Sequence, residues 1–122
     1  MNTSADRANR IQMLGFRGRD LFWIMSMGLV GNLAIIGILT FGGNAAYLPM
    51  TVMVVFANLL TVMGSLAAMD DIRGTTLDFD EEEAKTNMAK RFAATPWGAF
   101  KALIAIWFVG LALTELYIMW IA

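Results

Sequence analysis

A long uncharged stretch constrains the fold of this chain more than any other feature. From Leu21 to Met69 the sequence contains no Asp, Glu, Lys or Arg. A membrane-spanning helix needs about 20 apolar residues, so this stretch is long enough to cross a bilayer twice. It is interrupted by turn-forming residues, namely Gly42, Gly43, Asn44 and Pro49. Because such residues favour a turn, the stretch predicts a hairpin of two transmembrane helices.

A second apolar run, from Trp97 to Ala122, predicts a third span. Its only charged residues are Lys101 near its start and Glu115 near its end. The whole chain is 58% apolar and 16% charged, whereas soluble domains are about 45–50% apolar and about 25% charged. The sequence therefore predicts an all-α membrane protein with three transmembrane helices, over about 21–42, 48–69 and 96–120.

The remaining segments complete a division into four parts. Residues 1–20 form an amphipathic segment, predicted to lie as a helix at a membrane interface, with a tail that orders against a partner as the alternative. Residues 21–69 form the hairpin and residues 70–95 an acidic loop with a short helix. Residues 96–122 form the third span, for which Thr95 is the expected N-cap and Pro96 the first helical residue.

The distribution of positive charge predicts the orientation in the membrane. All nine Lys and Arg residues precede the first span or lie between the second span and the start of the third. Cytoplasmic loops carry an excess of Lys and Arg. We therefore expect a multi-pass protein of a bacterial-type inner membrane, with its N-terminus and acidic loop in the cytoplasm and its C-terminus in the periplasm.

The acidic loop contains the stretch Leu77 to Lys85, which carries five carboxylates. Asp80 and Glu83 have the spacing of a capping box, in which each side chain hydrogen-bonds the backbone N–H of the other residue. They predict the start of a helix over about residues 81–93. The alternative is that these carboxylates dock a basic cytoplasmic partner.

Two amides lie deep in the predicted hairpin. Asn32 and Asn58 each lie 13 positions from Ala45 in the turn, as 45 − 32 and 58 − 45 show, so an antiparallel hairpin brings them to the same depth. An unpaired amide in hydrocarbon costs several kcal/mol. We therefore expect an interhelical hydrogen bond between them, with a backbone carbonyl or a neighbouring subunit as alternative partners.

Glu115 is the one carboxylate that falls within an expected span. Its position near the end of that span predicts a side chain that reaches the lipid headgroups. A charged residue in a transmembrane segment is also a candidate functional residue, so contact with a partner subunit or an ion is the alternative for Glu115.

The absence of Cys and His restricts the chemistry that this chain offers. It supplies no thiolate or imidazole for zinc, copper, iron–sulfur clusters or haem, and no familiar catalytic nucleophile with its base. We expect no enzymatic activity, no cofactor, no metal site and no binding of nucleic acid.

Two functions remain. The first is a non-catalytic subunit of a larger inner-membrane complex of respiratory, photosynthetic or secretion type, whose partners are other membrane subunits and lipid. Small residues in the first two spans, which permit close helix approach, favour it. The second is a homo-oligomeric transporter, channel or holin-like pore.

Overall fold

The computed structural model describes residues 3–122, which are almost entirely helical and contain no strand. The elements in chain order are α1 (Ser4–Phe41), the 3-10 turn η1 (Asn44–Ala46), α2 (Tyr47–Leu77), α3 (Glu81–Ala84), α4 (Asn87–Ala94) and α5 (Trp97–Trp120). Three of them, α1, α2 with its preceding turn, and α5, are long and apolar enough to cross a membrane. The prediction of three such helices is confirmed.

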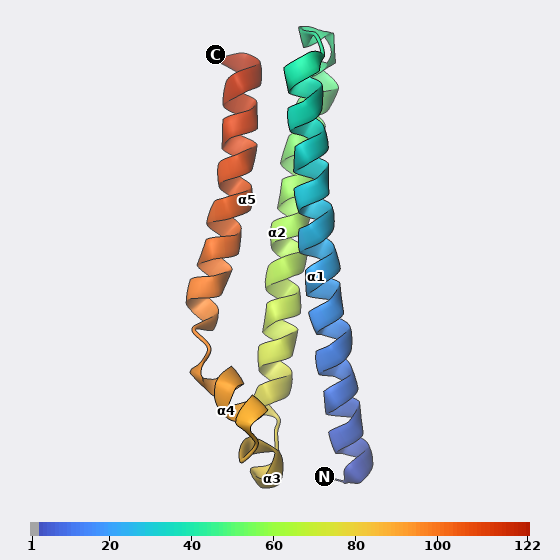
Figure 1. Ribbon diagram of the computed structural model, residues 1–122, viewed down its shortest axis with the longest axis vertical. Coiled ribbons are helices and arrows are strands. Elements are labelled where there is room, and N and C mark those ends of the chain that lie inside the picture. The colour runs from blue at the N-terminus through green and yellow to red at the C-terminus, as the bar shows by residue number, and fades with distance from the viewer. Residues whose placement is uncertain (1–2) are drawn as a thin grey trace.

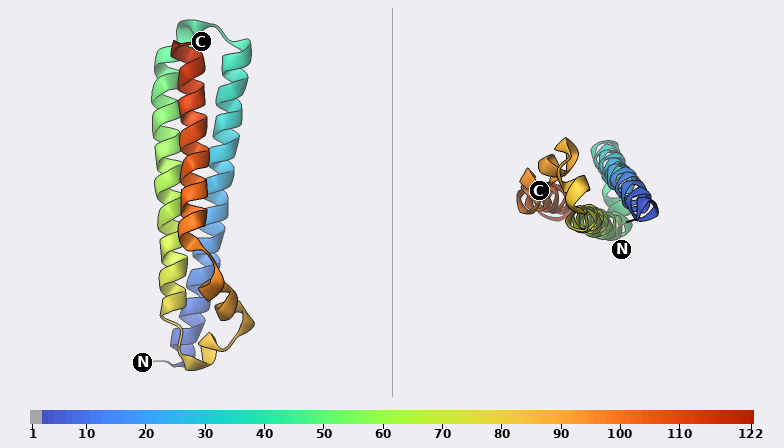
Figure 2. Two further views of the ribbon diagram at one scale, coloured as in Figure 1. Left: turned by 90° about the vertical axis from the view of Figure 1, so that its left-hand side faces the viewer. Right: turned by 90° about the horizontal axis from the view of Figure 1, so that it is seen from below.

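The three long helices run side by side along the length of the molecule (Figure 1). α2 lies between α1 and α5, as the end-on view shows (Figure 2), and it provides most of the packing for both. The N-terminus, α3 and α4 lie at one end, and η1 and the C-terminus lie at the other. All charged residues except Glu115 belong to the end that holds α3 and α4, which we call the charged end.

α1 is one continuous helix, longer than the predicted span. Thr3 caps it through a capping box with Asp6, in which Thr3 Oγ1 accepts from the Asp6 backbone N–H at 3.1 Å. At 38 residues the helix is about 57 Å long, far more than a hydrocarbon core of about 30 Å. Within the described residues, the segment expected to lie as a helix at a membrane interface is helical, but it continues into the first span without a break between Ser4 and Phe41. Its place at a membrane interface stays a prediction.

α2 also continues past the predicted end of its span at residue 69. Pro49 is tolerated because it lies in the first helical turn, where the backbone N–H has no partner within the helix. The polar residues after Met69 contain no proline, so the helix runs on for two more turns to Leu77. It ends at Asp78, whose N–H bonds back to the carbonyl of Thr75.

The loop helix is split into two pieces. α3 ends at Ala84, and Thr86 starts a new helix by accepting a hydrogen bond from the Ala89 N–H at 3.2 Å. A single helix over residues 81–93 is therefore wrong. Thr95 is the C-cap of α4 and not the N-cap of the third span, and Pro96 occupies that N-cap position.

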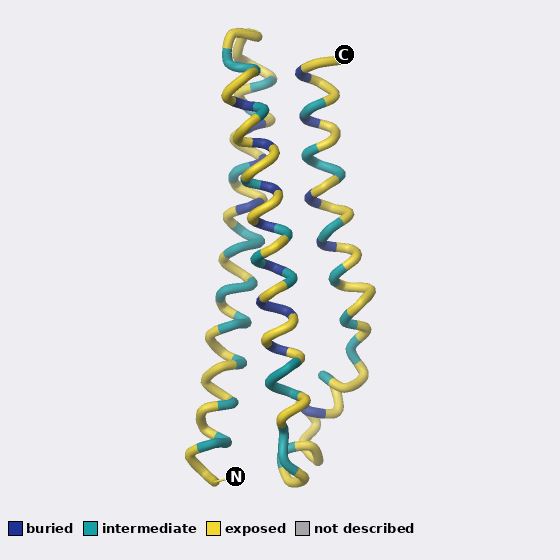
Figure 3. The backbone as a smooth tube through the Cα atoms, turned by 180° about the vertical axis from the view of Figure 1, so that it is seen from behind, coloured by how far each residue is buried: buried dark blue, intermediate teal, exposed yellow. Residues whose placement is uncertain are grey.

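Close approach between α1 and α2 depends on small residues. A Cβ at Gly28 would lie 2.6 Å from Thr61 Cγ2, so only glycine fits at this crossing. Gly64 similarly makes room for Ile24. The buried residues form a line along the inner face of α2 and the facing side of α5 (Figure 3).

Two apolar clusters hold the three helices together. One lies toward η1 and contains Ile35, Met50, Val54 and Met119. The other lies toward the charged end and contains Met69, Ile104 and Phe108. Between the two clusters the helices bury polar side chains, which are the first part of the candidate site.

Candidate functional site

The two deep amides contact each other across the hairpin. Asn32 Nδ2 donates to Asn58 Oδ1 at 2.9 Å and also to the Gly28 carbonyl at 2.7 Å. Asn58 Nδ2 donates to the carbonyl of Val54 at 2.8 Å. The structure thus contains both the interhelical bond and the bonds to backbone that were weighed as its alternative. We call Asn32 and Asn58 the amide pair.

The amide pair is enclosed within the chain. Asn32 is 4% exposed and Asn58 3% exposed, so neither side chain reaches the outer surface of the three helices. Within the described residues their hydrogen bonds are made to each other and to backbone carbonyls. The pair lies near the middle of the uncharged part of α1 and α2. Lipid provides no water there to satisfy a polar side chain, so an interhelical hydrogen bond does so instead.

Glu115 is buried as well, which contradicts the expected headgroup-exposed carboxylate. It is 2% exposed, because it projects from the face of α5 that packs on α2. The position of Glu115 near the end of its span predicts a polar environment. Its actual environment is set by the direction of its side chain, which the sequence position does not give. Neither carboxylate oxygen has a hydrogen-bond partner within the described residues.

The pairing of α5 with α2 places Glu115 close to the level of the amide pair. Trp120 Nε1 donates to Thr51 Oγ1 at 2.7 Å, and Lys101 pairs with Asp70. In this register Glu115 lies about half a helical turn from Asn58, on the side toward η1. The Asn32 Oδ1 atom also lacks a donor, so hydrogen-bond acceptors outnumber donors in this buried region.

The second part of the candidate site lies at the charged end. Arg7 Nε donates to Asp80 Oδ2 at 2.6 Å, and Arg10 Nε donates to Glu83 Oε1 at 3.0 Å. We call these four residues the arginine–carboxylate cluster. It joins the start of α1 to the start of α3, although the paired residues are 73 positions apart in the sequence.

Asp80 and Glu83 serve two roles in this cluster. The capping box is present, with the Glu83 N–H donating to Asp80 Oδ1 at 2.8 Å and the Asp80 N–H donating to Glu83 Oε1 at 3.2 Å. The remaining carboxylate lone pairs accept from the arginines. A basic group does bind the acidic loop, but it comes from α1 of the same chain.

These contacts shift the acidity of both carboxyls. The hydrogen bond from the Glu83 backbone N–H, and then the Arg7 guanidinium, lower the pKa of Asp80 below its ordinary range. The Arg10 guanidinium is the main cause that lowers the pKa of Glu83. Both carboxylates are therefore held ionised.

Further ion pairs continue from the cluster toward the spans. Arg17 Nε lies 2.8 Å from Asp71 Oδ2, and Lys101 pairs with Asp70. Sequence reasoning missed these pairings, and those of Arg7 and Arg10, because it treated each segment alone. The available signal was the opposite charge of two segments that the predicted topology brings to the same end.

The site offers ionic and hydrogen-bonding contacts within the chain. Among residues 3–122, no group of three or more His, Cys, Asp or Glu side chains is arranged to hold a metal ion. What the arrangement does is fix the helices relative to one another at two levels, by the amide pair inside the spans and by the arginine–carboxylate cluster outside them. Comparison of this chain with protein-family models, curated proteins and solved structures found no match.

Proposed function

We propose that this chain is a non-catalytic subunit of a larger inner-membrane complex of respiratory, photosynthetic or secretion type. It contributes three spans and a charged end to the assembly. The cations at the charged end support a cytoplasmic location for that end, by the Lys/Arg bias of cytoplasmic segments, and a periplasmic location for the C-terminus.

The observation that carries this proposal is a set of glycines on the outer surface of the spans. Gly31, Gly37 and Gly110 lie within α1 and α5, and a Cβ at each would meet nothing within 4 Å. Glycine costs about 1 kcal/mol relative to alanine inside a helix, and here no internal packing offsets that cost. Small residues on a lipid-facing helix let another helix approach closely, so these positions suit contact with a partner span.

Limited burial of the spans supports the same proposal. In the most apolar 18-residue stretch of each long helix, only a minority of the residues are buried, namely 17% in α1, 33% in α2 and 22% in α5. A large apolar surface therefore remains for lipid and for other membrane subunits. The internal ion pairs keep this surface in a defined shape, which suits a subunit that offers a packing surface.

The alternative, a pore or transporter made of several copies, gains less support. Such a pathway needs polar groups on the surface that the copies share. The amide pair and Glu115 face the inside of the three-helix unit. Exposed threonines of the described spans, such as Thr40 and Thr114, donate their hydroxyl to a carbonyl of their own helix.

Purification in mild detergent followed by native mass spectrometry tests the proposal. We expect the chain to co-purify with unrelated membrane subunits, and Gly31→Leu and Gly110→Leu to remove them without lowering the Tm of the isolated chain. Gly15→Leu is the matched control, since Gly15 is equally open but lies outside the uncharged part of α1. A discrete homo-oligomer that contains no other subunit would overturn the proposal.

A further inference from the structure

The nine cations of this chain fall into three groups. Five of the nine form ion pairs within the described residues: Arg7, Arg10, Arg17, Lys85 and Lys101. Arg19 lies over the ring of Phe16. The other three, Arg73, Lys90 and Arg91, form no ion pair within residues 3–122, and they all line hollows next to α4. Apart from Arg19, the cations that form no ion pair within the described residues therefore lie together beside α4.

A cleft lies where α2, α4 and α5 meet. It has a volume of about 270 Å³ and is lined by Arg73 and Leu77 of α2, Phe92 of α4 and Trp97 of α5. A more open hollow of about 870 Å³ beside α4 shares Phe92 with it and is lined by Lys90 and Arg91. The two spaces share Phe92 and Thr95 in their lining, so the three cations border neighbouring hollows, and Leu77, Phe92 and Trp97 form the apolar part of the cleft lining.

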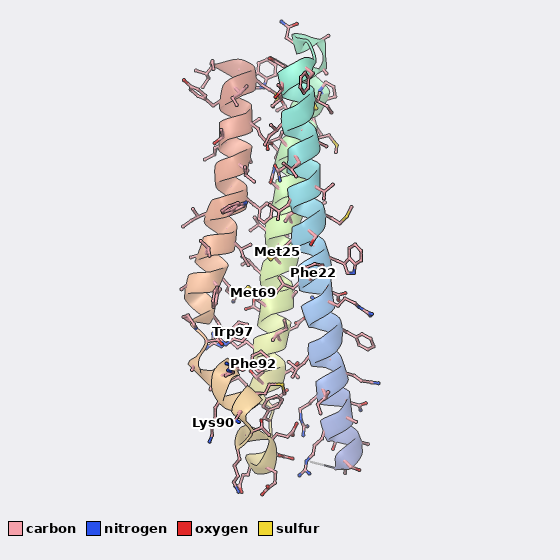
Figure 4. All side chains as sticks on the ribbon, in the orientation of Figure 1. Phe22, Met25, Met69, Lys90, Phe92 and Trp97 are labelled. Atoms are coloured by element: carbon pink, nitrogen blue, oxygen red, sulfur yellow. The ribbon has the colours of Figure 1, made fainter. Side chains whose placement is uncertain are left out.

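The apolar part of the cleft lining is fixed by internal contacts. The rings of Phe92 and Trp97 stack with centroids 6.1 Å apart, and Trp97 Nε1 donates to the Phe92 carbonyl at 3.0 Å. Figure 4 shows the two side chains together between α4 and α2. Because the indole N–H is already bonded within the chain, Trp97 offers its apolar surface to whatever occupies the cleft.

From its position along the helices, the cleft is expected at the interface of a bilayer. The Lys101–Asp70 pair marks the end of the uncharged part of α2 and α5, and Arg73 lies about one turn farther from the spans. Tryptophan is enriched at the level of the lipid headgroups. A ligand in this cleft is therefore positioned with its charged group among the headgroups and its apolar part against the spans.

We propose that this cleft binds the phosphate of an anionic phospholipid. Arg73 donates to the phosphate from α2, and Lys90 and Arg91 attract the negative headgroup from α4. Leu77, Phe92 and Trp97 contact the glycerol and the first acyl carbons. Contacts with these apolar side chains distinguish this ligand from free phosphate, for which only the polar and positively charged groups would provide contacts.

Lipid titration of the purified full-length chain in detergent, read by native mass spectrometry, tests the proposal. The probes are phosphatidylglycerol and phosphatidylcholine with the same acyl chains, and inorganic phosphate in excess as a competitor. We expect tighter binding of phosphatidylglycerol, and Arg73→Gln should reduce that preference about fivefold, as removal of one cation near an anionic headgroup does. Removing Lys90 and Arg91 as well should abolish it.

Arg19→Gln is the matched control, because Arg19 is also outside any ion pair of the described residues but lies on α1 away from the cleft. It should keep the preference for phosphatidylglycerol. Equal binding of the two lipids by the unmodified chain, or equal losses in Arg73→Gln and Arg19→Gln, would overturn the proposal. Displacement of the lipid by inorganic phosphate would assign the cleft to free phosphate and would also overturn it.

Discussion

At the scale of single residues, the structure shows how the spans treat polar side chains. Asn32 and Asn58 form hydrogen bonds with each other and with nearby carbonyls, whereas the buried Glu115 carboxyl has no hydrogen-bond donor within the described residues. The depth of the amides was predictable by counting from the turn. That they face each other was not, because facing depends on the rotation of α1 and α2, which Gly28 sets by its fit against Thr61.

A double-mutant cycle with Asn32→Leu and Asn58→Leu should show coupling between the two amides. Each single change leaves the other amide with one bond fewer, so the two losses should not add. We expect a coupling free energy of about 0.6–2 kcal/mol, as measured for hydrogen bonds between helices in lipid. Thermal unfolding of the four proteins in detergent provides the measurement, and strictly additive changes would contradict it.

Glu115→Leu should stabilise the chain. A carboxyl group without a hydrogen-bond partner is costly to bury, and leucine has a similar volume, so we expect a gain of about 1–4 kcal/mol in thermal unfolding in detergent. Met119→Leu, one turn away on the same face of α5, is the control and should change stability by less than about 1.5 kcal/mol. A clear loss in Glu115→Leu that Glu115→Gln does not share would instead indicate that the side chain binds a donor.

At the scale of elements, the sequence predicts the helices but not where their polar ends stop. α2 continues to Leu77 and α1 begins at Ser4, because polar residues there are compatible with helix and are supported by contacts from the other element. Arg17 of α1, for example, pairs with Asp71 of α2. Such support comes from residues far apart in the sequence, and the composition of either segment alone does not reveal it.

The arginine–carboxylate cluster should weaken in acid. The ordinary pKa values of Asp80 and Glu83 are 3.8 and 4.5, and both are lowered in the folded chain. Their contribution to stability is therefore complete above about pH 4.5 and is lost as the pH falls through the lowered values. The contact between the start of α1 and the α3 loop should loosen in that range.

Spin labels at Asn9→Cys and Glu82→Cys allow this loosening to be measured as a broader distance distribution below about pH 4. The chain has no cysteine of its own, so the two introduced residues are the only sites that react. A pair at Leu33 and Leu60, both exposed within the spans, is the control and should not respond to pH. An unchanged distance for the first pair through the whole acid range would show that the cluster does not hold α1 to the loop.

At the scale of the whole molecule, the proposed crossing of a membrane by α1, α2 and α5 predicts that the charged end and the η1 turn lie on opposite sides of it. A cysteine at Lys85 should react with an impermeant thiol reagent only from the cytoplasmic side, and one at Asn44 only from the periplasmic side. Both positions are exposed, so access depends on the membrane and not on the fold. Reaction of both from one side would disprove the hairpin.

The unbroken α1 has a mechanical consequence. About 25 Å of this helix, from Ser4 to Asp20, stands beyond the uncharged part, and the arginine–carboxylate cluster braces it near its tip. A segment without such contacts would change its orientation freely. The ion pairs of Arg7 and Arg10 instead hold the start of α1 against α3. Because one continuous helix joins the two regions, we expect a shift of α1 among the other long helices to be passed on to α3 through these ion pairs.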